Sequence, residues 1–179
     1  ESQLVFGRGW SYGAEFLLKK NVGKFTGWVS YTLSRTFRQF DDINAGDPFP
    51  ARQDRIHDVS VVGIYEPNKK WSFSTSFVYY TGDAVTFPSG SYEVEGQIIP
   101  YYTERNGYRI PDYHRLDLSA TYFGKNPNTN LNVSLYNAYG RRKVFTIDFQ
   151  ESETEPGNTE AVKTYLFQWV PSVTWNFNF

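Results

Sequence analysis

Cysteine and methionine are both absent from this chain of 179 residues. Without cysteine the protein can form neither disulfides nor thiolate metal sites, and without methionine Glu1 is not expected to be the translation start. No run of about 18 apolar residues occurs, which excludes a transmembrane helix. Basic and acidic residues number 18 and 19, so the basic patch that nucleic acids require is not expected, and nucleic acid is excluded as a partner.

Aromatic residues, by contrast, are abundant. Phe, Tyr and Trp make up 19% of the chain although its mean hydropathy is negative, at -0.54. Much aromatic surface with little aliphatic mass is typical of β-strands whose two faces meet different environments.

Two-residue alternation of apolar and polar side chains runs through most of the sequence and predicts an all-β fold. We expect about seven strands, at 9–21, 25–37, 55–65, 71–81, 113–123, 131–149 and 163–179. The stretch HDVSVVGIY is ambiguous in phase, and Trp28 falls on the otherwise polar side of its strand. The residues expected on the apolar, lipid-facing side are Trp71, Phe73, Phe77, Tyr79, Leu116, Leu118, Leu131, Val133 and Leu135.

The connections between these segments alternate between short and long. Those near 22–24, 66–70 and 124–130 are short, whereas those at 38–54, 82–112 and 150–162 are long. In an antiparallel meander alternate connections lie at the same end, so one end should carry tight turns and the other the long loops. This asymmetry is typical of a transmembrane β-barrel. A soluble β-sandwich or an eight-stranded lipid-binding barrel shows the same alternation and stays open as an alternative.

The strand number also matters for the extent of the barrel. Seven strands place the two termini at opposite ends, whereas bacterial single-chain barrels have an even number of strands. We therefore expect the chain, residues 1–179, to be a single segment from the C-terminal part of a longer barrel.

Four stretches resemble the C-terminal strands of TonB-dependent outer-membrane receptors of the kind found in Bacteroidota. They are GRGWSYGAEFLLKKNVGKFTGWVSYTLSRTFRQF, TFPSGSYEVEGQIIPYYTERNGYRIPDYHRLDLSATY, NLNVSLYNAYGRRKVF and VPSVTWNFNF. The resemblance implies a 22-stranded barrel in the cell outer membrane, surrounded by lipid and filled by an N-terminal plug domain that this segment lacks. Long loops would be extracellular, and short turns and the C-terminus periplasmic.

The same resemblance implies transport of a scarce nutrient such as a siderophore, glycan or peptide, a small-molecule or oligomeric substrate. Energy would come from the TonB complex through the N-terminal part of the receptor. The likeness to the glycan-importing branch, which pairs with a surface lipoprotein, is weaker and leaves that partner open. No cofactor is implied.

The last strand carries a large apolar residue at every second position. These residues are Val173, Trp175, Phe177 and Phe179. They match the terminal pattern that the barrel-assembly machinery reads in the resembled family, and an unpaired strand edge is physically suited to strand addition. The same rings could simply form the lower lipid-facing girdle, and the two interpretations are compatible.

The loop at 82–112 holds the candidate substrate-binding residues. Aromatic faces and guanidinium groups could bind sugars, peptides or carboxylate-bearing chelates, although they could equally hold the loop to the barrel mouth. The candidates are Tyr101, Tyr102, Arg105, Tyr108 and Arg109. The clustered Asp41, Asp42, Asp47 and Asp54 fit no EF-hand spacing, so no metal site is expected.

Catalysis is not expected. The two histidines, His57 and His114, belong to no G-x-S-x-G or H-E-x-x-H motif, and no phosphate-binding glycine loop occurs. Three functions thus remain in view: an energy-coupled transporter, a soluble carbohydrate- or ligand-binding β-sandwich, and a small complete outer-membrane barrel with a structural role.

Overall fold

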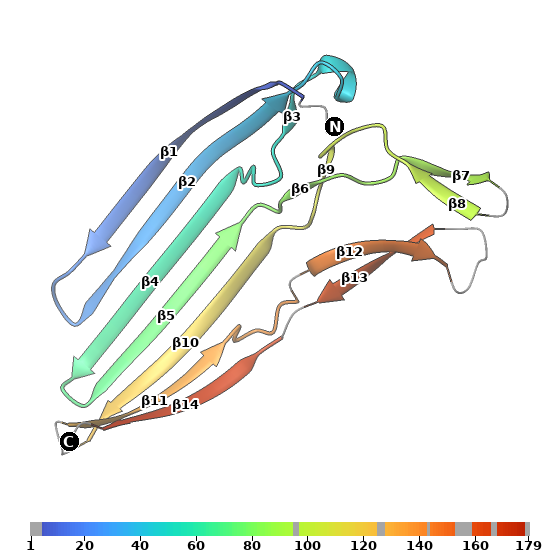
Figure 1. Ribbon diagram of the computed structural model, residues 1–179. Helices are drawn as coiled ribbons and strands as arrows, with labels where there is room; N and C mark the ends of the chain where they lie inside the picture. Colours follow the sequence, from blue (N-terminus) through green and yellow to red (C-terminus); the bar gives the residue numbers. More distant parts are fainter. Residues whose placement is uncertain are drawn as a thin grey trace.

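A computed structural model describes residues 5–94, 97–124, 128–142, 144–152, 159–165 and 168–177. Its centre is one antiparallel sheet of long, neighbouring strands (Figure 1). Their order across the sheet is β1 (Arg8–Lys20), β2 (Phe25–Gln39), β4 (His57–Asn68), β5 (Trp71–Tyr80), β10 (Tyr113–Phe123), β11 (Thr129–Tyr136) and β14 (Val170–Phe177). The short strand β3 (Phe49–Pro50) adds to β2. The prediction of an all-β antiparallel meander is confirmed.

Small elements fill the long connections. They are the 3-10 turn η1 (Asn44–Gly46) and three two-stranded sheets, formed by β6 (Ala84–Val85) with β9 (Tyr108–Arg109), β7 (Gly90–Val94) with β8 (Gln97–Tyr101), and β12 (Val144–Glu151) with β13 (Thr159–Tyr165). All of them lie at one end of the sheet, which we call the loop end; the opposite end carries the tight connections and is called the turn end (Figure 1). β1 starts at the loop end and β14 finishes at the turn end, as the odd strand count predicts.

Two predicted strands are wrong. The segments 131–149 and 163–179 each divide into two strands, and residues 150–162, predicted as a loop, contain the end of β12 and the start of β13. The break follows β11 at Asn137 and Gly140, which adopt positive φ values of 54° and 67°. A left-handed residue cannot continue a strand, so the chain leaves the sheet although its side-chain alternation resumes beyond the corner.

Register sorts the side chains of the main sheet onto two faces. Val61 pairs with Phe77, Phe77 with Leu116, and Leu131 with Trp175. The nine residues predicted on the apolar side therefore share one face, which we call the apolar face. The register also assigns the faces of β4, whose sequence HDVSVVGIY is ambiguous in phase. Its residues on the apolar face are Val59, Val61, Gly63 and Tyr65. Trp28 lies on the opposite, polar face, across from Val62.

No second layer covers the apolar face within the described part of the chain. Leu118 is 43% exposed and Val133 is 48% exposed, although each lies in a strand with a neighbouring strand on both sides. The buried apolar residues of the described ranges belong to the loop end or its margin, and they are Phe49, Ala51, Ala84 and Tyr113. The sheet is also open, since β1 and β14 each pair on one side among these residues. No helix in the described ranges is both long enough and apolar enough to span a membrane.

Candidate functional site

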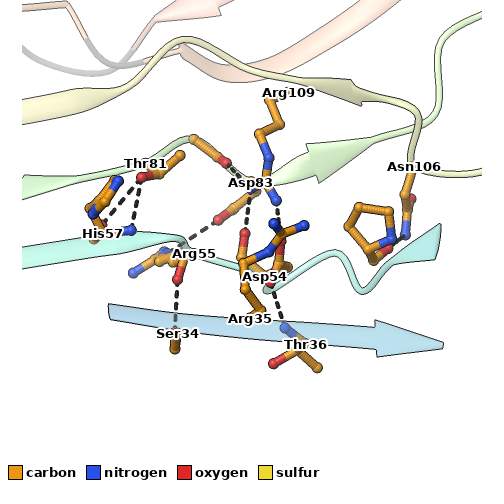
Figure 2. Close-up of polar contacts among 12 residues, drawn as sticks. Ser34, Arg35, Thr36, Asp54, Arg55, His57, Thr81, Asp83, Asn106 and Arg109 are labelled. Atoms are coloured by element: carbon orange, nitrogen blue, oxygen red, sulfur yellow. Dashed lines mark hydrogen bonds and ion pairs between the residues drawn. The ribbon is translucent and has the colours of Figure 1, made fainter. Parts of the chain in front are cut away.

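A buried carboxylate, that of Asp54, organises the loop end (Figure 2). Its side chain has no exposed surface, and its Oδ1 accepts a hydrogen bond from the Thr36 backbone N–H at 2.5 Å. Two guanidinium groups meet its other oxygen: Arg109 pairs with Oδ2, and Arg35 Nε lies 3.4 Å from the same atom. Arg109 also donates to the Gly82 carbonyl at 3.0 Å. The Asp54 carboxylate thus joins the segment before β4 to β2 and to Arg109. Through Arg109 it also connects the two ends of the 81–112 loop.

Backbone and side-chain hydrogen bonds extend this junction toward β5. The Arg55 guanidinium lies 3.2 Å from Asp83 and covers the Tyr80 ring at 4.2 Å, while Ser34 donates to the Arg55 carbonyl at 2.8 Å. The His57 N–H donates to Thr81 Oγ1 at 3.0 Å (Figure 2). The roots of the two long loops are therefore held as one unit.

Two asparagines make further contacts between the same two loops. Asn44 accepts from the Arg105 N–H at 2.7 Å and donates to the Arg105 carbonyl at 3.2 Å. Asn106 donates to the Pro50 carbonyl at 2.8 Å. Both asparagines have positive φ, at 54° and 55°, a conformation that asparagine tolerates better than most residues.

Asp112 provides a second junction, between β5 and β10. It accepts hydrogen bonds from the Tyr79 hydroxyl at 2.6 Å and from the Gly82 N–H at 3.1 Å, and its carbonyl accepts from Arg141 at 2.9 Å. The phenol hydrogen bond is the largest of the effects that hold the pKa of Asp112 below its ordinary value, against the opposing effect of burial.

Asn137 forms a third junction, where β11 leaves the sheet. It is 1% exposed, and its N–H donates to Asp117 Oδ1 at 2.8 Å. Its side-chain amide donates to the carbonyls of Arg141 and Gln168, and its Oδ1 accepts from the Arg141 N–H at 3.1 Å. One asparagine therefore holds both ends of the connection that carries β12 and β13.

The β7–β8 hairpin turns an aromatic face outward. Tyr92 pairs with Ile99 and Gly90 with Tyr101, so these positions share one side of the hairpin. A Cβ on Gly90 would lie 2.6 Å from the Tyr101 ring, which shows that the ring rests on the glycine backbone. The Tyr92 and Tyr101 ring centroids are 6.4 Å apart, and the two side chains are 52% and 45% exposed.

The five predicted substrate-binding residues do not form a single cluster of free groups. Tyr101 and Tyr102 are exposed. Tyr108 stacks on Phe87 at 4.1 Å, and the backbone of Arg105 is held by Asn44 while its side chain is exposed. Arg109 forms an ion pair with Asp54. This contact holds the loop in place, the alternative role that the sequence left open for these residues. The structure therefore leaves Tyr101, Tyr102 and Arg105 as the groups best placed to meet a ligand.

The four aspartates of the 38–54 segment separate in the structure. Asp54 is buried against arginines, whereas Asp41, Asp42 and Asp47 are exposed. Within the described ranges no group of His, Asp and Glu side chains is placed to hold a metal ion.

The polar face of the sheet carries hydrogen-bonded small side chains. Ser74 and Ser119 lie 3.1 Å apart across β5 and β10, and Asn132 donates to Ser119 and to Thr121. Near the loop end of β10, Arg115 forms a 2.9 Å ion pair with Asp117. Ser74, Ser119, Thr121 and Asn132 thus form hydrogen bonds across three strands of this face.

The terminal strand presents its rings on the apolar face. Val173 pairs with Val133 and Trp175 with Leu131, and the exposed fractions of Val173, Trp175 and Phe177 are 69%, 68% and 51%. Phe179, the last residue of the predicted assembly pattern, lies outside the described residues. Pro171 causes no shift in the β11–β14 register.

Sequence reasoning missed Asp112 and Asn137 as positioning residues. In the sequence Asp112 is simply the last residue of the 82–112 loop, and Asn137 falls inside the predicted strand 131–149. The sequence N-A-Y-G is a turn signal that could have revealed the corner at Asn137. No local pattern predicts that Asp54 and Arg109 meet, because 55 residues separate them.

No family model, curated protein or solved structure matches the chain. Its function is therefore inferred from its own residues and geometry.

Proposed function

We propose that this chain forms part of the wall of an outer-membrane β-barrel, in a transporter of the TonB-dependent receptor type that imports a scarce nutrient. The observation that carries the proposal is the apolar face, which continues across seven neighbouring strands without a covering layer among the described residues. In water such a surface is far larger than the apolar patches of ordinary monomers. Against hydrocarbon it is the expected exterior.

The polar face supports the same assignment. Serine, threonine and asparagine side chains hydrogen-bond across β5, β10 and β11, as suits the wet interior of a barrel. Open sheet edges do not persist in lipid, so β1 and β14 would pair with further strands of the barrel, or with other copies of the chain when it is reconstituted alone.

The loop end is suited to an extracellular, ligand-facing role. Its roots are held by Asp54, Asp112 and Asn137, whereas Tyr101 and Tyr102 remain exposed. Exposed, rigidly supported rings can contact a ligand at low entropic cost. In this proposal Tyr101, Tyr102 and Arg105 contact the nutrient, while Tyr108 and Arg109 support the loop.

Fluorescence quenching by lipids brominated on their acyl chains tests the orientation of the sheet. Two single-tryptophan variants would be reconstituted into vesicles, one retaining Trp71 on the apolar face and the other Trp28 on the polar face. We expect strong quenching of Trp71 and weak quenching of Trp28. Equal quenching of the two, or failure of the chain to enter vesicles, would overturn the proposal.

A second candidate is a soluble protein that binds an apolar ligand. It is favoured by a hollow of about 570 Å³ in the apolar face, lined by Phe73, Leu118 and Val133 among others, a volume typical of small-molecule sites. This alternative requires the chain to be monodisperse in buffer without detergent. Sedimentation in the absence of detergent separates the two candidates.

A further inference from the structure

Positive charge is segregated along the sheet. All ten arginines belong to the loop half of the chain's strands and loops, whereas six of the eight lysines belong to the turn end. The described members of this lysine group, here called the turn-end lysines, are Lys19, Lys20, Lys24, Lys69 and Lys70. The remaining one, Lys125, lies outside the described residues. Glu66 is the acidic residue of the two described turns, so the turn end is distinctly basic.

The turn-end lysines have no carboxylate partners among the described residues. None of the ion pairs within 4.0 Å that the described part of the chain forms includes them. Their turns are nevertheless fixed, because Glu66 N–H donates to the Lys24 carbonyl at 2.7 Å and Phe123 N–H donates to the Lys70 carbonyl at 2.8 Å. The backbone of these turns is thus fixed, and the lysine side chains remain available to an external anion.

A hollow between the turns connects these charges to the apolar face. Its volume is about 590 Å³, and its lining includes Lys24, Lys69, Glu66, Trp71 and Phe123. Trp71 stacks on Phe73 with 5.7 Å between ring centroids and contacts Tyr122 at 5.0 Å. Lysines at the rim therefore adjoin a band of rings that continues directly into the apolar face.

We infer that this hollow binds the negatively charged headgroup of an anionic phospholipid, in preference to a zwitterionic one, in the leaflet on the turn side of the membrane. The inference rests on the proposed function, since it requires the apolar face to lie in lipid. Lys24 and Lys69 would meet the phosphate, while the Trp71 ring lies at the boundary between headgroup and acyl chain, the depth that tryptophan prefers. A free anion would contact only the lysine side chains. A phospholipid would also place its acyl chains against Trp71 and the neighbouring rings of the apolar face.

Each lysine near an anionic membrane surface contributes about a fivefold gain in affinity. The chain would be reconstituted into vesicles of equal parts phosphatidylglycerol and phosphatidylcholine, and the lipids retained after detergent extraction would be counted by native mass spectrometry. We expect the wild type to retain phosphatidylglycerol in clear excess. Substituting both Lys24→Gln and Lys69→Gln should bring the ratio close to one, whereas Lys163→Gln in β13, at the loop end, should leave it unchanged.

Protection from protease in the same vesicles reports insertion separately from lipid preference. Failure of the wild type to insert would contradict the membrane proposal itself. Insertion with equal retention of both lipids, or with a preference that survives the double substitution, would overturn the anionic-headgroup site alone. If the double variant does not insert, the salt dependence of the wild type tests the site instead. Its preference for phosphatidylglycerol should fall sharply between 0.1 and 1 M salt, because salt screens the lysine charges.

Discussion

The Arg109 guanidinium and the Asp54 carboxylate, 55 residues apart in the chain, meet at the loop end of the sheet. Arg109 lies in β9 and Asp54 precedes β4, so their contact joins the β2–β4 connection to the β5–β10 connection (Figure 2). Because the Asp54 side chain is fully buried and also receives the Thr36 N–H, the pair positions these loops rather than serving as a free binding group.

Replacing Asp54 by Asn should loosen both loops. The substitution leaves Arg109 and Arg35 without their counter-charge, and the loss of hydrogen bonds to a charged group costs about 1.5–3 kcal/mol. The free energy of unfolding and the rate of protease cleavage within 81–112 would be measured. Asp47→Asn, in the exposed part of the same loop, is the matched control and should change stability by less than about 0.5 kcal/mol. Equal effects of the two changes would contradict the assigned role of Asp54.

Stability should depend on pH through Asp112. Its folded-state pKa lies below its ordinary value of 3.8, chiefly because the Tyr79 hydroxyl donates to the ionised form. The unfolded state therefore binds the proton more readily, so this contribution is present above about pH 4 and is lost as pH falls through the folded-state pKa. Unfolding measured between pH 6 and 3 should show a shallower acid loss in Asp112→Asn and in Tyr79→Phe. A pH profile identical to that of wild type in both variants would refute this linkage.

Asn137 should tolerate glycine better than alanine. Glycine keeps the left-handed conformation at φ 54° and loses only the side-chain hydrogen bonds, whereas alanine also incurs about 1–2 kcal/mol of backbone strain. The unfolding free energies of Asn137→Gly and Asn137→Ala should differ by about that amount. Limited proteolysis of the β12–β13 connection checks that the loss is local, and alanine and glycine variants of equal stability would count against the corner as described.

Charge placed on the two faces of the sheet should have opposite consequences. An arginine at the lipid midplane costs about 2–4 kcal/mol, whereas lumen positions accept it. Leu118→Arg and Phe77→Arg lie on the apolar face and Ser74→Arg on the polar face. We expect the first two to block insertion into vesicles and the third to insert nearly as well as wild type. Similar insertion of all three would reverse or abolish the assigned orientation.

The terminal strand should matter for assembly as well as for stability. Trp175 projects from the apolar face and is 68% exposed, whereas its neighbour Thr174 lies on the other face. If Val173, Trp175, Phe177 and Phe179 form an assembly signal, Trp175→Asn should reduce the fraction delivered to the outer membrane of cells several-fold more than Thr174→Asn. Spontaneous insertion into pure lipid vesicles serves as the comparison. An equal loss in both settings would indicate a lipid-facing role alone.

The sequence alone determined the first five long strands, the antiparallel direction of the sheet and the separation of tight turns from long loops. Each of these follows from local rules: period-two alternation puts Phe77 and Leu118 on one side and Ser74 and Ser119 on the other whatever their partners are. Even the termini follow, because an odd number of antiparallel strands must begin and finish at opposite ends.

The tertiary structure determined the contacts between distant parts of the chain, which the alternation of apolar and polar residues does not predict. The left-handed corner at Asn137 divides a segment whose alternation continues on both sides of it, and its stability comes from Gln168 and Asp117, both distant in the chain. The guanidinium of Arg109 supports the loop because Asp54, 55 residues away in the chain, pairs with it. Pairings of this kind depend on which strands become neighbours, and short-range patterns carry no information about that choice.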